Sequence, residues 1–185
     1  MKITVVILYY HKEYHSRMEL VQQLKKDGID KGLCRLWQMK LKQGLTYKDL
    51  IGLYIRGIDF CIKGDYPTLD FIREHFKGKC EPYGVFVDDD LEQSNLPNIV
   101  LNGKCRAFLD YDGYSVSNIY ARDSTKCSVN ISDYAIVTID AFDNAELFVA
   151  TSGDDAKVLI NVYGNAKIEC LGNGIKVNYK NKKTY

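Results

Sequence analysis

The sequence predicts an α+β protein, with a mainly helical domain at residues 1–90 followed by a repetitive β domain at residues 98–185. Two observations favour this organisation. Apolar residues recur at helical spacing in the first part of the chain, whereas short β-type runs alternate with turn residues after Pro97. The acidic and polar segment at about residues 90 to 98 is therefore the expected domain boundary.

The β domain is expected to consist of units of about ten residues. The clearest units begin at Asp133, Asp143, Asp154, Gly164 and Gly172, and weaker ones begin at Asn102, Asp112 and Asp123. Each unit starts with Asp, Asn or Gly, which tolerate the left-handed backbone of a tight corner. Alternating apolar residues follow, as in Val158, Ile160 and Val162, and these are expected to point inward.

Two architectures fit this pattern. One is a parallel β-solenoid with two units in each rung, and the other is an antiparallel β-meander whose Asp-Asn and Gly-Asn pairs form hairpin turns. We favour the solenoid, because the repeated Ala-Lys-(Val/Ile) motif brings like residues into register, as parallel stacking requires.

The helical domain is expected to contain four helices. The apolar run Ile3 to Tyr10 is a buried strand or a short buried helix. The first helix starts at a capping box from Ser16 to Glu19 and ends at Gly28. The others span about Lys31–Gln43, about Thr46–Gly64 with Gly57 at a close helix contact, and a segment with Pro67 in its first turn.

The location of the protein is expected to be cytoplasmic. The run Ile3 to Tyr10 is too short to span a bilayer, and no small-residue cleavage site follows it. The six cysteines are widely spaced and form no metal-binding or redox motif, so we interpret them as reduced, mostly buried thiols.

The string from Leu53 to Cys61 (LYIRGIDFC), with the Asp-Asn-Ala and Tyr-Gly-Asn-Ala units, resembles small uncharacterised proteins of Bacteroides-type bacteria and their phages. The resemblance covers about residues 45 to 179. It implies an intracellular protein encoded by a phage or mobile element, with a helical N-terminal segment and a repetitive β tail. It implies no activity and no functional residues.

Charge is distributed unevenly along the chain. Residues 1–87 carry a net charge of +5, residues 88–155 carry −9, and residues 156–185 carry +5. An acidic surface of this kind can imitate nucleic-acid phosphates and occupy a basic groove, but aspartate is also an ordinary solvated corner residue. The candidate acidic face comprises Asp112, Asp123, Asp133, Asp143, Asp154 and Asp155.

Tyrosines in the β domain are candidate binding residues, because tyrosine is enriched at interaction hot spots. The candidates are Tyr111, Tyr114 and Tyr134, although as core or strand residues they need no binding role.

No sequence motif indicates catalysis, a cofactor or a metal. His11 and His15 have the spacing of metal ligands on a helix but lack a third ligand. Asp88, Asp89, Asp90 and Glu92 could attract a divalent cation but lack the spacing of a calcium loop, which favours a solvated acidic linker. We therefore expect no enzyme activity, no metal and no cofactor.

The expected function is a non-catalytic protein-binding module. In its most specific form it is a phage or mobile-element inhibitor that presents an acidic solenoid face to a host nucleic-acid enzyme. The alternative is a structural module that self-assembles into a homo-oligomer through solenoid ends or faces. Direct nucleic-acid binding and membrane association are not expected.

Overall fold

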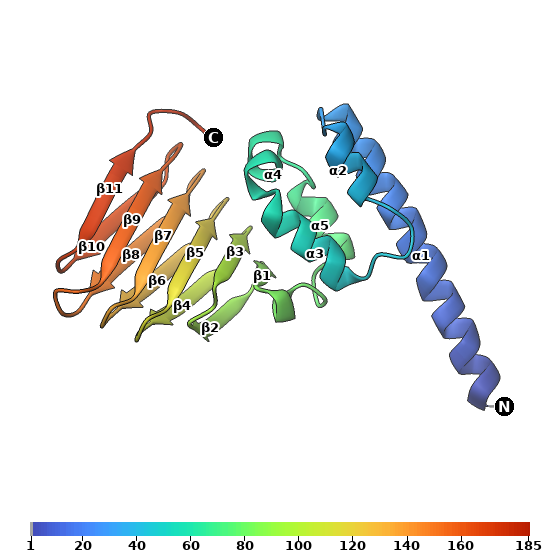
Figure 1. Cartoon of the computed structure of the whole chain (residues 1–185), viewed down its shortest axis with the longest axis horizontal. Helices are drawn as coiled ribbons and strands as arrows, with labels where there is room; N and C mark the ends of the chain where they lie inside the picture. The colour runs from blue at the N-terminus through green and yellow to red at the C-terminus, as the bar shows by residue number, and fades with distance from the viewer. Residues whose placement is uncertain (1) are drawn as a thin grey trace. The chain divides into compact units, whose positions relative to one another are not determined.

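The computed structural model describes the backbone of residues 2–185 and the side chains of residues 16–185. The chain divides into two compact units, Met1–Phe76 and Lys77–Tyr185. The first unit is helical and the second is a β-solenoid, so the α+β class is confirmed (Figure 1).

The helical unit begins with one long helix, α1 (Lys2–Asp30). The run Ile3 to Tyr10 is therefore helical, and the capping box expected at Ser16 is wrong because the helix continues through it. Gly28 does not end the helix either. A Cβ atom on Gly28 would lie 3.0 Å from Leu33 and from the Tyr66 hydroxyl, so this glycine serves close packing.

Shorter helices follow: α2 (Arg35–Lys40), α3 (Tyr47–Arg56), α4 (Ile58–Gly64) and α5 (Leu69–His75). The expected cap at Thr46 is confirmed, because its hydroxyl accepts a hydrogen bond from the Asp49 amide at 3.2 Å. Gly57 separates α3 from α4, and its Cβ would lie 3.3 Å from the Trp37 ring, which confirms the close helix contact. Thr68 is the N-cap of α5, so Pro67 lies before the helix and not in its first turn.

The solenoid contains two parallel sheets. Sheet A contains β1 (Val85–Val87), β3 (Asn98–Asn102), β5 (Val116–Ala121), β7 (Ile136–Ala141), β9 (Lys157–Val162) and β11 (Ile175–Tyr179). Sheet B contains β2 (Asp90–Ser94), β4 (Arg106–Tyr111), β6 (Lys126–Ile131), β8 (Glu146–Thr151) and β10 (Lys167–Leu171). Every strand pair is parallel, so the antiparallel meander is wrong.

Successive strands alternate between the two sheets, so each rung uses one strand of each (Figure 1). Val116 pairs with Ile136 and Lys126 pairs with Glu146, one rung later in each sheet. The ten-residue unit of the sequence is therefore half a rung. The inward residues of both sheets form one continuous core, in which Ile119, Val129 and Ile139 are fully buried.

The expected boundary at residues 90 to 98 is wrong in position. The strand β2 occupies Asp90–Ser94 and pairs with β4, and β1 pairs with β3. The solenoid unit therefore begins at Lys77, before the acidic segment. A 3-10 turn at Glu81–Tyr83 leads into β1.

Two rows of turns connect the sheets. Corner I is the row that leads from sheet A to sheet B, with residues 88–89, 103–105, 122–125, 142–145 and 163–166. Corner II is the row that leads from sheet B to sheet A, with residues 112–115, 132–135, 152–156 and 172–174. Backbone hydrogen bonds join the turns within each row, for example from Asn144 to Asp123 in corner I and from Tyr134 to Gly113 in corner II.

Within the part of the chain that the structure describes, no helix combines the length and the apolarity needed to cross a bilayer.

Candidate functional site

An exposed pair of stacked tyrosines marks corner II. Tyr114 and Tyr134 lie on adjacent rungs, with ring centroids 5.1 Å apart and an interplanar angle of 5°. Their exposed fractions are 82% and 52%. The stack arises because the two turns are one rung apart in register, which places equivalent side chains next to each other.

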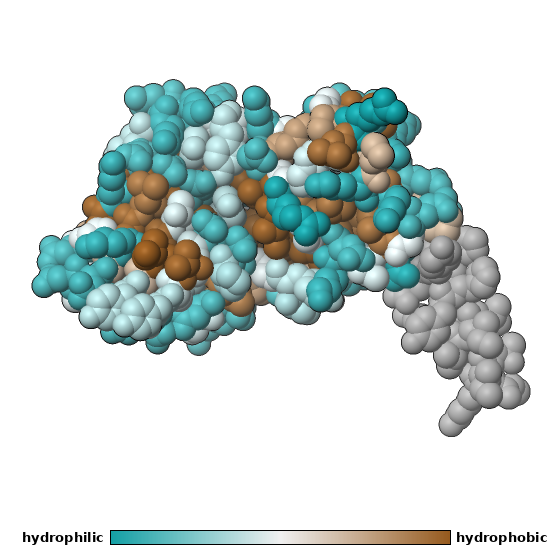
Figure 2. Space-filling view, in the orientation of Figure 1, coloured by the Kyte–Doolittle hydropathy of each residue, from teal (hydrophilic) through white to brown (hydrophobic). Residues whose placement is uncertain are grey.

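Apolar side chains extend this tyrosine pair onto sheet A. Val116 and Ile136 are paired in register on β5 and β7, immediately after the two turns, and both are exposed. Figure 2 shows that hydrophobic residues (brown) interrupt the hydrophilic surface of the solenoid. We call Tyr114, Val116, Tyr134 and Ile136 the corner II patch. A contiguous apolar and aromatic patch is typical of an interaction site, whereas singly exposed apolar residues are not.

Four of the six candidate aspartates lie in the same row of turns as this patch. Asp112, Asp133, Asp154 and Asp155 all lie in turns of corner II and are exposed. Asp112 accepts a hydrogen bond from the Asn95 side chain at 2.6 Å, and Asp154 accepts one from Asn173 at 3.2 Å. Each of these two bonds occupies one oxygen and leaves the carboxylate at the surface.

The other two candidate aspartates lie in corner I, so the structure does not gather all six on one face. Asp123 and Asp143 have φ values of 58° and 59°, the left-handed region that a corner requires. Their carboxylates bind backbone of the preceding rung: Asp123 accepts from the Gly103 amide at 2.7 Å, and Asp143 accepts from the Asp123 amide at 3.1 Å. Both residues therefore hold adjacent rungs together.

Asp133 of corner II both binds backbone of the preceding rung and lies at the surface. It has a φ of 54° and accepts a hydrogen bond from the Gly113 amide at 3.0 Å, as the corner I aspartates do. It also lies next to Tyr134, so its charge contributes to the surface of the corner II patch.

Tyr111 is not a surface residue, and its assignment as a binding tyrosine is wrong. Its side chain points inward from β4 in phase with Ala107 and Leu109, and only 1% of it is exposed. Burial raises the pKa of its hydroxyl, which is consistent with a core position.

Corner I has its own aromatic stack, but this one is covered. The rings of Phe142 and Tyr163 lie on adjacent rungs with centroids 4.6 Å apart, and both side chains are buried. Tyr185 packs edge-on against both rings, with centroids at 5.2 and 5.4 Å. Its hydroxyl donates a hydrogen bond to the Asp140 carboxylate at 2.5 Å.

The segment that carries Tyr185 is basic. The Lys182 ammonium lies 5.9 Å from the centre of the Tyr163 ring, and the Lys182 carbonyl accepts a hydrogen bond from the Gly164 amide. A basic segment that ends in tyrosine therefore occupies the corner I stack. Sequence reasoning missed this contact, because nothing in the local pattern links Tyr185 to Asp140, 45 residues earlier.

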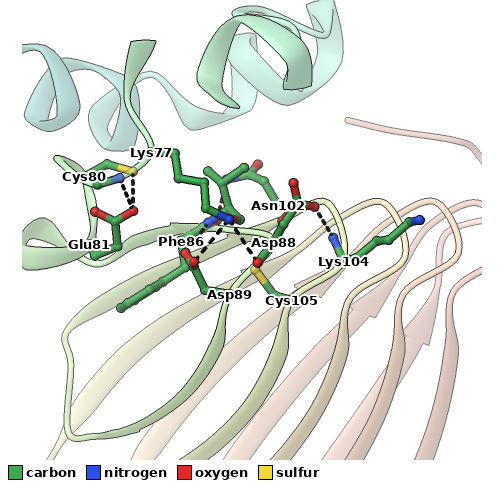
Figure 3. A network of polar contacts seen from close by, with 11 residues as sticks. Lys77, Cys80, Glu81, Phe86, Asp88, Asp89, Asn102, Lys104 and Cys105 are labelled. Atoms are coloured by element: carbon green, nitrogen blue, oxygen red, sulfur yellow. Dashed lines mark hydrogen bonds and ion pairs between the residues drawn. The ribbon is translucent and has the colours of Figure 1, made fainter. Parts of the chain in front are cut away.

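In the acidic segment, Asp88 and Asp89 form the turn between β1 and β2, and Asp90 is the first residue of β2. The Lys77 ammonium binds the Val87 carbonyl at 2.6 Å and lies 3.4 Å from the Asp89 carboxylate (Figure 3). Asp88 accepts a hydrogen bond from the Lys104 amide at 2.8 Å. Among the described residues, no three histidine, cysteine or acidic side chains converge to hold a metal.

The expected pair of metal ligands, His11 and His15, lies outside the residues whose side chains the structure describes.

Four of the six thiols are buried, namely Cys61, Cys80, Cys105 and Cys127. Burial raises the pKa of Cys105 to about 11 and that of Cys127 to about 12, which keeps these thiols protonated and unreactive at neutral pH. Cys34 and Cys170 are exposed, so the thiols are mostly buried, as expected.

A second exposed surface lies on the outer face of sheet B. It is an open groove of about 520 Å³ flanked by Phe108 and Phe148, with Ser128 between them in register. The basic side chains beside it are partly neutralised, because Lys126 and Lys167 both pair with Glu146. Its two aromatic rings are not stacked on each other, which distinguishes this groove from corner II.

Comparison with known proteins finds no match among protein-family models, curated proteins or solved structures.

Proposed function

We propose that this protein is a non-catalytic protein-binding module, and that corner II receives a basic segment carrying an aromatic residue. The observation that carries the proposal is the Tyr114–Tyr134 stack, which the chain leaves exposed. Aromatic side chains of this kind are enriched at interaction hot spots, because they bury a large area at a small cost in conformational entropy.

The negative charge of corner II indicates a partner with positive charge. Asp112 lies in the turn that carries Tyr114, Asp154 and Asp155 lie in the turn one rung beyond Tyr134, and all three residues are exposed. The register that pairs Ile136 with Lys157 places Asp155 one rung beyond Tyr134. Complementary charge on a partner speeds its association and selects against acidic competitors. A segment with lysine or arginine beside an aromatic ring therefore fits this surface.

The covered stack in corner I supports this choice of partner. There, Tyr185 packs edge-on against two stacked rings and Lys182 lies over one of them. The protein thus contains one example of a basic, tyrosine-containing segment bound to an aromatic stack at a solenoid corner. Corner II offers a second stack of similar geometry, with centroids 5.1 Å apart compared with 4.6 Å.

The most specific form of the proposal is an inhibitor, encoded by a phage or mobile element, that occupies the basic groove of a nucleic-acid enzyme. The acidic residues of corner II would meet the lysines and arginines that such a groove uses for phosphates. Asp123 and Asp143 bind backbone in corner I. In this form of the proposal, the surface that meets the enzyme therefore contains the corner II carboxylates and not all six.

The test uses a defined probe, a synthetic peptide with the sequence of residues 180–185 (KNKKTY). Its titration into the ¹⁵N-labelled protein, followed by NMR, is expected to shift the amides of Tyr114 and Tyr134 and their neighbours. The same peptide with tyrosine replaced by serine is expected to shift them much less. Raising the salt concentration is expected to weaken binding, because exposed charges are screened.

Matched variants separate this surface from other aromatic surfaces. Tyr114→Ser/Tyr134→Ser is expected to abolish the shifts, whereas Phe108→Ser/Phe148→Ser removes two exposed rings elsewhere and is expected to leave them intact. Asp112→Asn/Asp154→Asn/Asp155→Asn is expected to weaken binding and to flatten its salt dependence. Equal binding by the tyrosine variant and the wild type would rule out the proposal.

A further inference from the structure

We propose that the solenoid end formed by β10 and β11 joins a second copy of this chain, through antiparallel pairing of β10 with β10 of the partner. The inference is independent of corner II, since it depends on the last rung and not on the tyrosine stack. We call Ile168, Cys170, Ile175, Val177 and Tyr179 the open end.

The open end consists of core positions that lack the next rung. Tyr179 pairs in register with Val162, of which 4% is exposed, yet 66% of Tyr179 is exposed. Cys170 pairs with the fully buried Val149 and is itself exposed. Repeat proteins normally end in a rung with a polar outer face, because an exposed core is costly in water. Here the inward residues of the last rung are apolar.

The backbone of this end is also available for pairing. β10 and β11 are the last strands of sheets B and A, so one side of each has no neighbouring strand within the described chain. An edge of this kind is a template for another strand. The segment after β11 does not cover it: Lys180 and Tyr185 bind residues of earlier rungs, Val162 and Asp140.

Charge complementarity identifies a second copy as the occupant. In the antiparallel register centred on Ile168, Lys167 lies opposite the partner's Glu169, and the same contact occurs twice by symmetry. The register centred on Glu169 would instead place two glutamates opposite each other. The outward charges of β10, Lys167 and Glu169, therefore favour a self-complementary pairing with one preferred register.

This pairing continues a charge pattern already present on sheet B. Lys126, Glu146 and Lys167 follow one another in register on β6, β8 and β10. The Glu146 carboxylate binds the Lys126 ammonium at 3.0 Å and the Lys167 ammonium at 3.2 Å. The partner's Glu169 would be the next member of this alternating row. Since both copies use the same end, the contact closes as a dimer and does not extend into a filament.

Sedimentation equilibrium of the full chain tests the dimer. Wild type is expected to dimerise with increasing concentration, and Glu169→Lys is expected to raise the dissociation constant at least tenfold, because it places two lysines opposite each other. Lys167→Glu/Glu169→Lys is expected to restore most of the affinity, since the opposite charges are exchanged. Asp155→Lys makes the same change in net charge at corner II and is expected to dimerise as wild type does.

Cross-linking tests the register. Opposed Cα atoms in an antiparallel pair lie within the range that a disulfide bridges. The register centred on Ile168 places Cys170 opposite the partner's Ala166, so Ala166→Cys in a Cys34→Ser background is expected to form a disulfide-linked dimer upon mild oxidation. Cys34→Ser alone is expected not to form one, because the two copies of Cys170 lie about 13 Å apart along the strands.

Three results would overturn the proposal. A wild-type chain that remains monomeric at every attainable concentration excludes the dimer. A dimer that Glu169→Lys leaves unchanged excludes β10 as its interface. A disulfide that joins Cys170 to the partner's Cys170 in Cys34→Ser excludes the proposed register. Corner II binding can succeed or fail in each case, so failure here leaves the proposed function testable.

Discussion

The two corners of the solenoid carry the same structural feature, which is buried in one corner and exposed in the other. Each has a pair of aromatic rings stacked across adjacent rungs, Phe142 with Tyr163 in corner I and Tyr114 with Tyr134 in corner II. In corner I the chain covers the stack with Tyr185, and the rings are buried. In corner II the rings remain in solvent. The difference lies in what covers the stack and not in how it is built.

With the exception of Asp133, the aspartates of the two corners differ in the same way. Asp123 and Asp143 of corner I accept hydrogen bonds from backbone amides of the preceding rung. Asp155 of corner II is exposed and lies one rung beyond Tyr134 of the corner II patch. We infer that corner I stabilises the solenoid and that corner II presents a surface. Substitutions of Asp123 and Asp143 should therefore affect stability, and those of Asp112, Asp154 and Asp155 should affect binding. Asp133 accepts a hydrogen bond from the Gly113 amide at a φ of 54°, so its substitution should affect stability as well.

The largest effect on stability is expected for Asp143→Ala. Alanine is strained at a φ of 59° and leaves the Asp123 amide without its acceptor, so the free energy of unfolding should fall by about 2 to 3 kcal/mol. Asp143→Gly removes only the hydrogen bond and should cost less. Asp154→Ala in corner II should change stability by less than about 0.5 kcal/mol. Urea unfolding measures all three, and equal losses at Asp143 and Asp154 would refute the distinction between the corners.

The next largest effect is expected for Tyr185. Tyr185→Phe removes the hydrogen bond to Asp140 and should lower the free energy of unfolding by about 1 kcal/mol. Tyr185→Ala also exposes the Phe142–Tyr163 stack and should cost about 2 kcal/mol or more. Thermal unfolding of the two variants gives the comparison. If Tyr185→Ala lowers the free energy of unfolding by no more than Tyr185→Phe does, then Tyr185 does not cover the stack in solution.

Alkaline pH should remove the contribution of the Tyr185 hydroxyl. Burial, followed by the hydrogen bond to Asp140, raises the pKa of Tyr185 above its ordinary value of 10.0. A raised pKa in the folded state means that this stabilisation is fully present below about pH 10 and declines as the pH rises beyond it. The difference in stability between wild type and Tyr185→Phe should therefore be constant up to about pH 10 and then shrink. A difference that is unchanged at pH 11 would contradict the buried hydroxyl.

Among the aromatic substitutions, the smallest effect on stability is expected for the exposed stack. Tyr114→Ser/Tyr134→Ser should lower the free energy of unfolding by only about 0.5 to 1 kcal/mol, since both rings lie largely in solvent and lose little more than their mutual contact. Urea unfolding of this double variant and of Tyr185→Ala, measured in parallel, compares the two losses of stability. A loss as large as that of Tyr185→Ala would indicate a structural role for corner II.

Much of the solenoid could be predicted from the sequence, because corner residues and alternating apolar residues are local signals. Asp133 and Asp143 mark successive corners, and the parallel register follows from the likeness of the units. The inward position of Tyr111 is also a local signal, since Tyr111 alternates in phase with Leu109. The strand β2 was missed because its sequence DLEQS is polar and only Leu91 reaches the core.

The candidate site was predicted less completely. Units ten residues apart alternate between the corners, so Asp133 and Asp143 could not form one face even though both begin a unit. The continuity of α1 through Ser16 was missed because a local capping signal was present where the helix did not need one. The cover over the corner I stack could not be predicted, since it depends on a contact between Tyr185 and Asp140 across the fold.

The central claim is that an aromatic stack on this solenoid binds a basic, tyrosine-containing segment whenever the chain leaves it uncovered. The most direct test is NMR titration of the peptide KNKKTY into wild type and into a chain that ends at Tyr179. The peptide should shift corner II amides in both proteins and corner I amides only in the shortened one. Shifts at neither corner of the wild-type protein, or shifts confined to the groove between Phe108 and Phe148, would contradict the account.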